Sequence, residues 1–139
     1  MRDAVDATGR DIKKLSDMDA MNLGYVSLLK DRHSRGLLED ECLVCGAAAK
    51  SGQLEELKAL RAKNFPWNLS TCLLAASGGH LETLKWAREN GCPWDEQTCA
   101  WAAKGGHLET LKWARENGAP WNEYARRFAA SKGYVESEG

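Results

Sequence analysis

Thiol and imidazole groups are the side chains of this chain that could do chemistry on their own. Cys42 and Cys45 have the spacing of a zinc-ligand or redox pair. The remaining possible ligands come singly further along the chain, at Cys72, His80, Cys99 and His107. Zinc sites group their ligands in paired clusters, whereas Cys45, Cys72 and Cys99 are 27 residues apart. We therefore expect no metal centre and no cofactor.

Other catalytic patterns are also missing. Gly78-Gly79-His80 follows a helical pattern rather than a strand, so it predicts a helix-joining turn and not a phosphate-binding loop. No serine lies in a nucleophile elbow. The counterparts of His80 and His107 in the neighbouring copies are Gln53 and Tyr134, and a catalytic base would not vary so freely. We expect a protein that is not an enzyme.

Composition limits the classes of partner. The 139 residues carry a formal net charge of −1, with 28% charged and 43% hydrophobic residues. This balance lacks the strongly basic field that nucleic-acid binding needs, and no apolar run approaches the roughly 18 residues of a membrane span. The first residues contain no apolar signal core. We expect a cytoplasmic protein with reduced thiols, and leave the nucleus or an organelle open.

The elements that position these residues form an internal repeat. Residues 71–97 and 98–124 align without a gap and differ at six of 27 positions. The differing pairs are Leu73/Ala100, Leu74/Trp101, Ser77/Lys104, Cys92/Ala119, Asp95/Asn122 and Gln97/Tyr124. Because one copy is too short to close a core, the copies are expected to stack into an all-α helix-turn-helix solenoid. The recurring cysteine then predicts small buried core side chains.

The repeat divides the chain into an amino-terminal cap or arm, residues 1–16, and an array, residues 17–139. The array consists of a degenerate copy at 17–43, copies at 44–70, 71–97 and 98–124, and a partial copy at 125–139. In each full copy the pattern predicts two short helices separated by a tight turn. Asp95 or Thr98 is expected to cap the first helix of the third copy, and Gly118 to end its second helix.

Five of the six tryptophans recur at two repeat positions. Trp86 and Trp113 lie at the edge of the apolar face of the second helix, where we expect them to pack between copies. The members of a second set each follow proline, at Trp67, Trp94 and Trp121, and are expected to hold the loop onto the stack. Most of the aromatic content is thus predicted to be framework.

The motif Ala-Ala-x-x-Gly-His-Leu-Glu-x-Leu-Lys, at residues 75–85 and 102–112, followed by Asn-Gly-x-x-Trp-Asp/Asn, resembles the ankyrin repeat. The resemblance covers residues 44–133 and, less closely, 17–43. It implies a helix-turn-helix array that binds proteins. The unit here is roughly six residues shorter than the ankyrin repeat of about 33 residues, and the missing part is the hairpin finger. The resemblance therefore implies a finger-less, tryptophan-rich variant whose inner helices make the contacts.

Candidate binding residues are found at positions that differ between copies while the rest of the repeat is unchanged. Substitutions between near-identical copies should accumulate where packing does not decide, which favours the surface. We define the first-helix ladder as the variable positions of the first helix and its entry: Leu73, Leu74, Ser77, Gln97, Ala100, Trp101, Lys104, Tyr124, Arg127 and Phe128. Aromatic residues of this kind dominate binding hot spots. Alternatively, Leu74, Trp101 and Phe128, which share one position, fill gaps between helices.

The sequence thus predicts a non-catalytic protein-binding module, an adaptor or scaffold that presents the first-helix ladder to a protein partner. It predicts no nucleic-acid partner and no membrane partner. One alternative is a structural subunit that is permanently docked in a larger complex. A second, less favoured alternative is a small metal- or thiol-based enzyme.

Overall fold

The computed structural model of the chain describes residues 14–133, so the arm expected at 1–16 lies almost entirely outside the described residues. Among these described residues the secondary-structure elements are nine α-helices. They are α1 Asp17–Asn22, α2 Val26–Ser34, α3 Cys42–Lys50, α4 Leu54–Ala62, α5 Leu69–Ser77, α6 Leu81–Glu89, α7 Glu96–Lys104, α8 Leu108–Glu116 and α9 Glu123–Ser131. The all-α prediction is confirmed.

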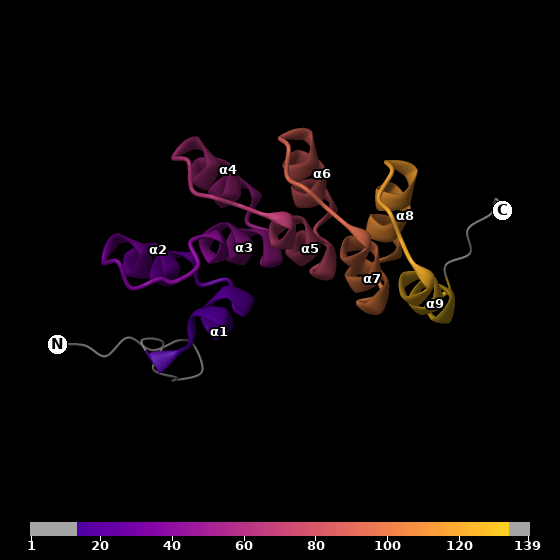
Figure 1. The fold of residues 1–139 in the computed structure, drawn as a ribbon, viewed down its shortest axis with the longest axis horizontal. Helices are drawn as coiled ribbons and strands as arrows, with labels where there is room; N and C mark the ends of the chain where they lie inside the picture. The colour runs from indigo at the N-terminus through magenta and orange to yellow at the C-terminus, as the bar shows by residue number, and fades with distance from the viewer. Residues whose placement is uncertain (1–13, 134–139) are drawn as a thin grey trace.

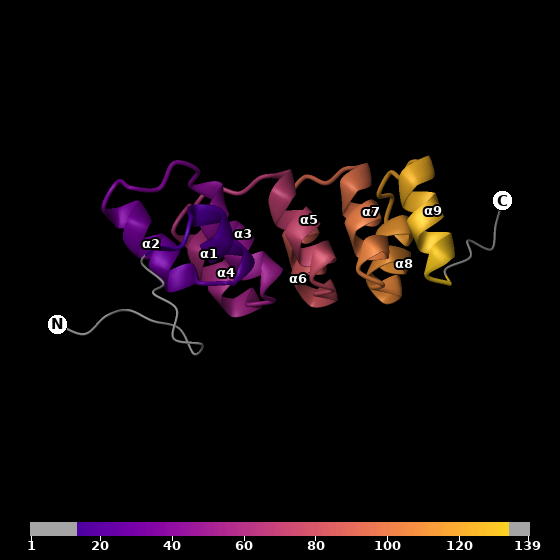
Figure 2. The same ribbon diagram turned by 90° about the horizontal axis from the view of Figure 1, so that it is seen from below.

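The helices form an array of two layers. The odd-numbered helices each pack on the next in line, from α1 to α9, and Figure 2 shows α3, α5, α7 and α9 side by side. The helices α4, α6 and α8 each pack on the first helix of their own copy and spread apart on the other side (Figure 1). This is the helical repeat architecture predicted from the 27-residue period.

Small side chains let the first helices approach closely. The recurring cysteines Cys45, Cys72 and Cys99 are fully buried, as predicted, and two alanines follow each of them on the same face. The second helices add larger side chains to the core, including Leu57, Leu60, Leu84 and Leu111. A nine-residue helix is too short to be stable alone, so burial between neighbours is what stabilises each one.

The tight turns lock successive copies together. The His80 Nε2 atom lies 3.0 Å from the carbonyl oxygen of Lys50 in the preceding copy. Gln53, at the equivalent position, donates from Nε2 to the carbonyl of Gly24 at 3.1 Å. His107 occupies the same place over Gly79, whose φ is +72° and where a Cβ atom would lie 2.5 Å from His107 Nδ1. These residues therefore join neighbouring copies, which is the structural role expected for the histidines.

The loops between copies are held by a three-part stack, which we call the Arg–Trp–Trp sandwich. The guanidinium of Arg88 lies 4.2 Å from the ring centre of Trp94 and donates to the carbonyl of Cys92 at 2.5 Å. On its other side, Trp94 meets Trp113 of the next copy edge-on, with ring centres 5.8 Å apart. Arg61, Trp67 and Trp86 repeat the arrangement one copy earlier. The tryptophans predicted as framework do pack between copies.

Side-chain caps fix the start of most first helices. Asp95 accepts a hydrogen bond from the backbone N–H of Gln97 at 3.0 Å, so Asp95 and not Thr98 caps α7. Asn68 and Asn122 cap α5 and α9 in the same way. The helices consequently begin two residues before the copy boundaries drawn from the sequence at 71, 98 and 125. No helix among the described residues has the length and apolar character of a membrane span.

Replacing Trp94 by alanine should separate framework from surface tryptophans. We expect Trp94→Ala to lower the free energy of unfolding by about 3 kcal/mol, because the sandwich loses its central ring. Trp101→Ala should lower it by less than about 1 kcal/mol, since Trp101 is 38% exposed and outside any sandwich. Urea unfolding followed by circular dichroism measures both. Equal losses of unfolding free energy in the two variants would contradict the assignment of Trp94 to the framework and Trp101 to the surface.

Candidate functional site

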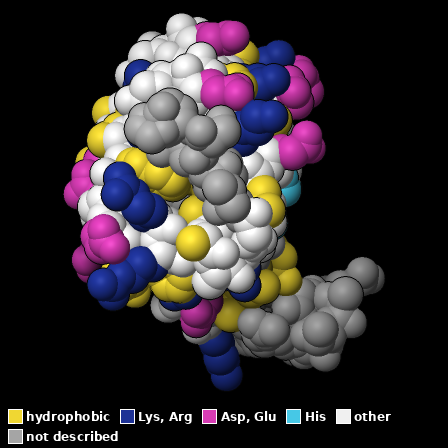
Figure 3. Space-filling view, turned by 90° about the vertical axis from the view of Figure 1, so that its right-hand side faces the viewer, with side chains coloured by type: hydrophobic (Ala, Val, Ile, Leu, Met, Phe, Trp, Pro, Cys, Tyr) yellow, Lys and Arg dark blue, Asp and Glu magenta, His cyan; other side chains and the backbone are white. Residues whose placement is uncertain are grey.

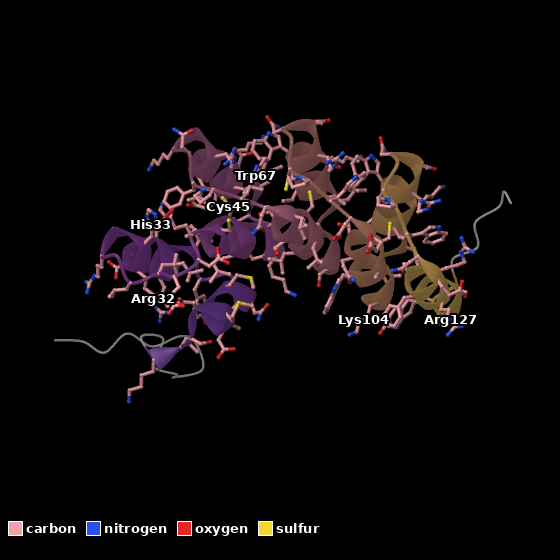
Figure 4. The ribbon with its side chains drawn as sticks, viewed as in Figure 1. Arg32, His33, Cys45, Trp67, Lys104 and Arg127 are labelled. Atoms are coloured by element: carbon pink, nitrogen blue, oxygen red, sulfur yellow. The ribbon has the colours of Figure 1, made fainter. Side chains whose placement is uncertain are left out.

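One side of the array is formed by the exposed face of the first helices. In α7 this face carries Gln97, Ala100, Trp101 and Lys104, which are three or four residues apart and therefore adjacent on a helix. Figure 4 shows Lys104 on α7 and Arg127 on α9 at the edge of the array opposite Trp67. These four positions of the first-helix ladder thus lie together along α7.

A groove of about 460 Å³ lies on this face between α7 and α9. We call it the α7–α9 groove and define it by the residues that line it: Gln97, Ala100, Trp101, Lys104, Asn122, Tyr124 and Phe128. Six of them belong to the first-helix ladder. The structure therefore gathers the later half of the ladder into one concave surface.

Aromatic rings form the walls of the groove. Tyr124 is 63% exposed and Trp101 is 38% exposed. Phe128 is half-buried and meets Tyr124 edge-on, with ring centres 4.8 Å apart. The Lys104 ammonium lies 4.8 Å from the centre of the Trp101 ring, a cation–π contact that holds the charge beside the aromatic surface. The groove therefore combines exposed apolar surface with one fixed positive charge.

The remaining ladder residues lie elsewhere. Leu74 is only 9% exposed, and a Cβ atom at Gly46 would lie 3.0 Å from its Cδ1 atom, so Leu74 fills the space between α3 and α5. Leu73 is half-buried against the core. Ser77 accepts a hydrogen bond from Lys50 at 3.4 Å. Arg127 is exposed beside the groove and pairs with Glu123 at 3.3 Å.

At the position shared by Leu74 and Trp101, the sequence left open whether the residue binds a partner or fills a gap between helices, and the two copies differ in this respect. Leu74 is a packing residue, whereas its counterpart Trp101 reaches the surface. The preceding helix differs between the two copies. Leu74 lies against Gly46, which has no side chain, whereas the residue one period after Gly46 is Leu73. Ala100, at 5% exposure, and the pair Cys92/Ala119 are also buried, so the differences between copies are not all on the surface.

Asn122 is the groove residue that the sequence reasoning missed. Its side chain caps α9 by accepting from the backbone N–H of Ala125 at 2.9 Å, and it also lines the groove. The signal was present, because Asp95/Asn122 is one of the six differences between copies. The ladder does not contain it, because the ladder was defined by the first helix and its entry.

The surface around the groove carries both signs of charge. Figure 3 views the array from the α9 end and shows Lys and Arg side chains interspersed with Asp, Glu and hydrophobic side chains. In the part of the chain that the structure describes, no group of three His, Cys, Asp or Glu side chains could hold a metal ion.

The thiols differ in access. Burial raises the pKa of the Cys45 thiol to about 12, and a hydrogen bond with Cys92 together with burial raises the pKa of Cys72. Cys92 lies in the loop between copies but is fully buried, and its thiol contacts the Asn68 carbonyl at 3.4 Å. A hydrogen bond with Cys72 lowers the pKa of Cys92. Only Cys42 is partly exposed. Burial is the main cause of the raised pKa of the Cys42 thiol, and the negative charge of Asp40 raises this pKa further.

In the native protein, Ellman's reagent should therefore label Cys42 alone. Labelling should be slow at neutral pH and accelerate as pH rises, because a raised pKa leaves little reactive thiolate until the solution is alkaline. The four buried thiols should react only after urea unfolding. Cys42→Ser should abolish native labelling, and a second thiol that labels rapidly in this variant would restore the thiol-enzyme alternative.

Comparison with known proteins adds no family assignment. No protein-family model matches the chain, and a search of curated proteins finds no match.

Proposed function

We propose that this protein is a non-catalytic binding module that recruits a protein partner through the α7–α9 groove and serves as an adaptor or scaffold. We further propose that its array is a short ankyrin-type variant without the hairpin finger. The fully buried, reduced cysteines of the core are compatible with a reducing, intracellular setting.

One observation carries the proposal: the exposed rings of Trp101 and Tyr124 line a surface groove together with the half-buried ring of Phe128. Trp67, Trp86, Trp94 and Trp113 take part in the sandwiches, whereas Trp101 and Tyr124 are exposed. Exposed Trp and Tyr residues that lie together on a concave surface are the residue types that dominate binding energy at interfaces. Burying their rings against an apolar patch of a partner would supply the affinity.

The scaffold favours this use because the groove is built on stacked helices rather than on loops. Helices α7 and α9 pack directly on each other, so the positions of the rings are fixed before a partner arrives. A rigid surface loses little conformational entropy on binding. Lys104 and Arg127, at the edge of the array, would orient the partner through charge (Figure 4).

A permanently docked subunit is the second candidate, and the last helix favours it. Ala130 is exposed, while its counterparts Ala49, Ala76 and Ala103 are fully buried by the next copy. The outer side of α9 thus exposes an alanine at a position that is buried in the other copies, although Arg126 stands where those copies have the buried Cys45, Cys72 and Cys99. A partner that covers this face would extend the stack.

Affinity capture from a lysate of the source cells tests the proposed function. The Trp101→Ala/Tyr124→Ala double variant should lose the partner that the wild-type protein captures, because the two exposed rings are removed from the groove. Quantitative mass spectrometry of the two captures gives the comparison.

Two controls make the result decisive. Circular dichroism should show equal helicity for the wild type and the double variant. A matched variant on α8, Lys112→Ala/Glu116→Ala, changes two exposed residues outside the groove and should capture the partner normally. Full retention of the partner by the Trp101/Tyr124 variant would place the contact elsewhere, with the uncovered face of α9 as the next surface to test.

A further inference from the structure

The differences between the two near-identical copies are concentrated in the groove. Of the six differing pairs, five place their later member in the groove lining: Ala100, Trp101, Lys104, Asn122 and Tyr124. The sixth pair, Cys92/Ala119, is buried. The framework that joins the copies is identical, so the two copies differ mainly in the surface they present between neighbouring first helices.

Two of these differences change charge, and both act in the same direction. Lys104 adds a positive charge where the preceding copy has Ser77. Asn122 is neutral where the preceding copy has Asp95, although both residues perform the same helix-capping role. The groove is therefore more positive by two units than the equivalent surface one copy earlier.

The positive charge of Lys104 is not neutralised within the described chain. No carboxylate of residues 14–133 lies within ion-pair distance of its ammonium, which instead contacts the Trp101 ring. Glu123 pairs with Arg127 at 3.3 Å, and Asp95 caps the start of α7, at the other end of that helix from Lys104. An incoming carboxylate would thus meet an unpaired cation beside an aromatic wall.

The other differences make the groove apolar and deep enough for a side chain. Ala100 is smaller than its counterpart Leu73, while Trp101 and Tyr124 are aromatic where the preceding copy has Leu74 and Gln97. The resulting volume of about 460 Å³ accepts a large apolar side chain and some of the backbone that carries it.

We infer that the occupant of the groove is an acidic segment of a partner protein, in which a large apolar side chain lies between the rings and an adjacent Asp or Glu pairs with Lys104. This inference rests on the proposed function and specifies the chemistry of the partner. A single-stranded nucleic acid would also stack on aromatic rings, but it needs a basic stripe along its backbone. The groove supplies one lysine, and the whole chain has a net charge of −1.

Selection from a phage-displayed library of random peptides against the full chain tests the inference. We expect enriched peptides to share a Leu, Phe, Met or Trp with an Asp or Glu within one helical turn. Fluorescence polarisation with the most enriched peptide then gives Kd values. Lys104→Glu should weaken binding by about tenfold or more, because it replaces attraction by repulsion at a desolvated contact. The matched control Lys112→Glu, on α8, should leave Kd unchanged.

Each outcome separates the inference from the proposed function. If enriched peptides need Trp101 but show no acidic preference, or if Lys104→Glu binds like Lys112→Glu, the acidic partner is wrong while the groove remains a binding site. If enriched peptides bind the Trp101→Ala/Tyr124→Ala variant equally well, the groove itself is wrong. Failure to enrich any peptide, or displacement of the peptide by a single-stranded oligothymidine at equal concentration, would also overturn the inference.

Discussion

Close packing between the small-residue faces of consecutive first helices is the constraint on which the rest of the structure depends. The helices from α2 to α9 have nine residues each, too few to persist alone, so each copy is stable only against its neighbours. Alanine and cysteine allow that close approach, and they are fully buried wherever another helix follows. Every other feature of the array, including the histidine turns and the Arg–Trp–Trp sandwiches, strengthens contacts between consecutive copies.

This constraint also explains why the two central copies differ at only a few positions. Residues that join one copy to the next must suit two neighbours at once, so the two central copies keep them identical. The exposed positions of the first helix, such as Trp101 and Tyr124, are less restricted, because their side chains reach the surface. A stack of this kind can therefore change its binding surface one copy at a time without changing its framework. Most of the differences between the two central copies lie in the α7–α9 groove.

Much of the fold could be predicted from the sequence because the repeat is a strong signal. The helix-turn-helix copies, the buried cysteines, the Asp95 cap and the packing of Trp86 and Trp113 between copies follow from periodicity and residue type. Exposure at the shared ladder position could not be predicted. It depends on the residue one helix earlier, which is Gly46 in one copy and Leu73 in the next.

The candidate site could be predicted only in part. The first-helix ladder consists of positions on single helices, whereas a groove is formed by two helices, and the distance between them is a property of the folded stack. Asn122 entered the lining because the cap of α9 lies beside the face of α7, a proximity that linear spacing does not reveal. A loop position likewise suggests exposure for Cys92, whereas the folded chain buries this residue completely.

The most direct measurement is the affinity of a variant whose groove is converted to the chemistry of the preceding copy, by Trp101→Leu, Lys104→Ser, Asn122→Asp and Tyr124→Gln together. Each introduced residue already occupies the equivalent position one copy earlier, so the array should fold with wild-type helicity. Isothermal titration calorimetry with the captured partner compares the two proteins. We predict that the folded variant no longer binds. Wild-type affinity in that variant would contradict the assignment of function to the α7–α9 groove.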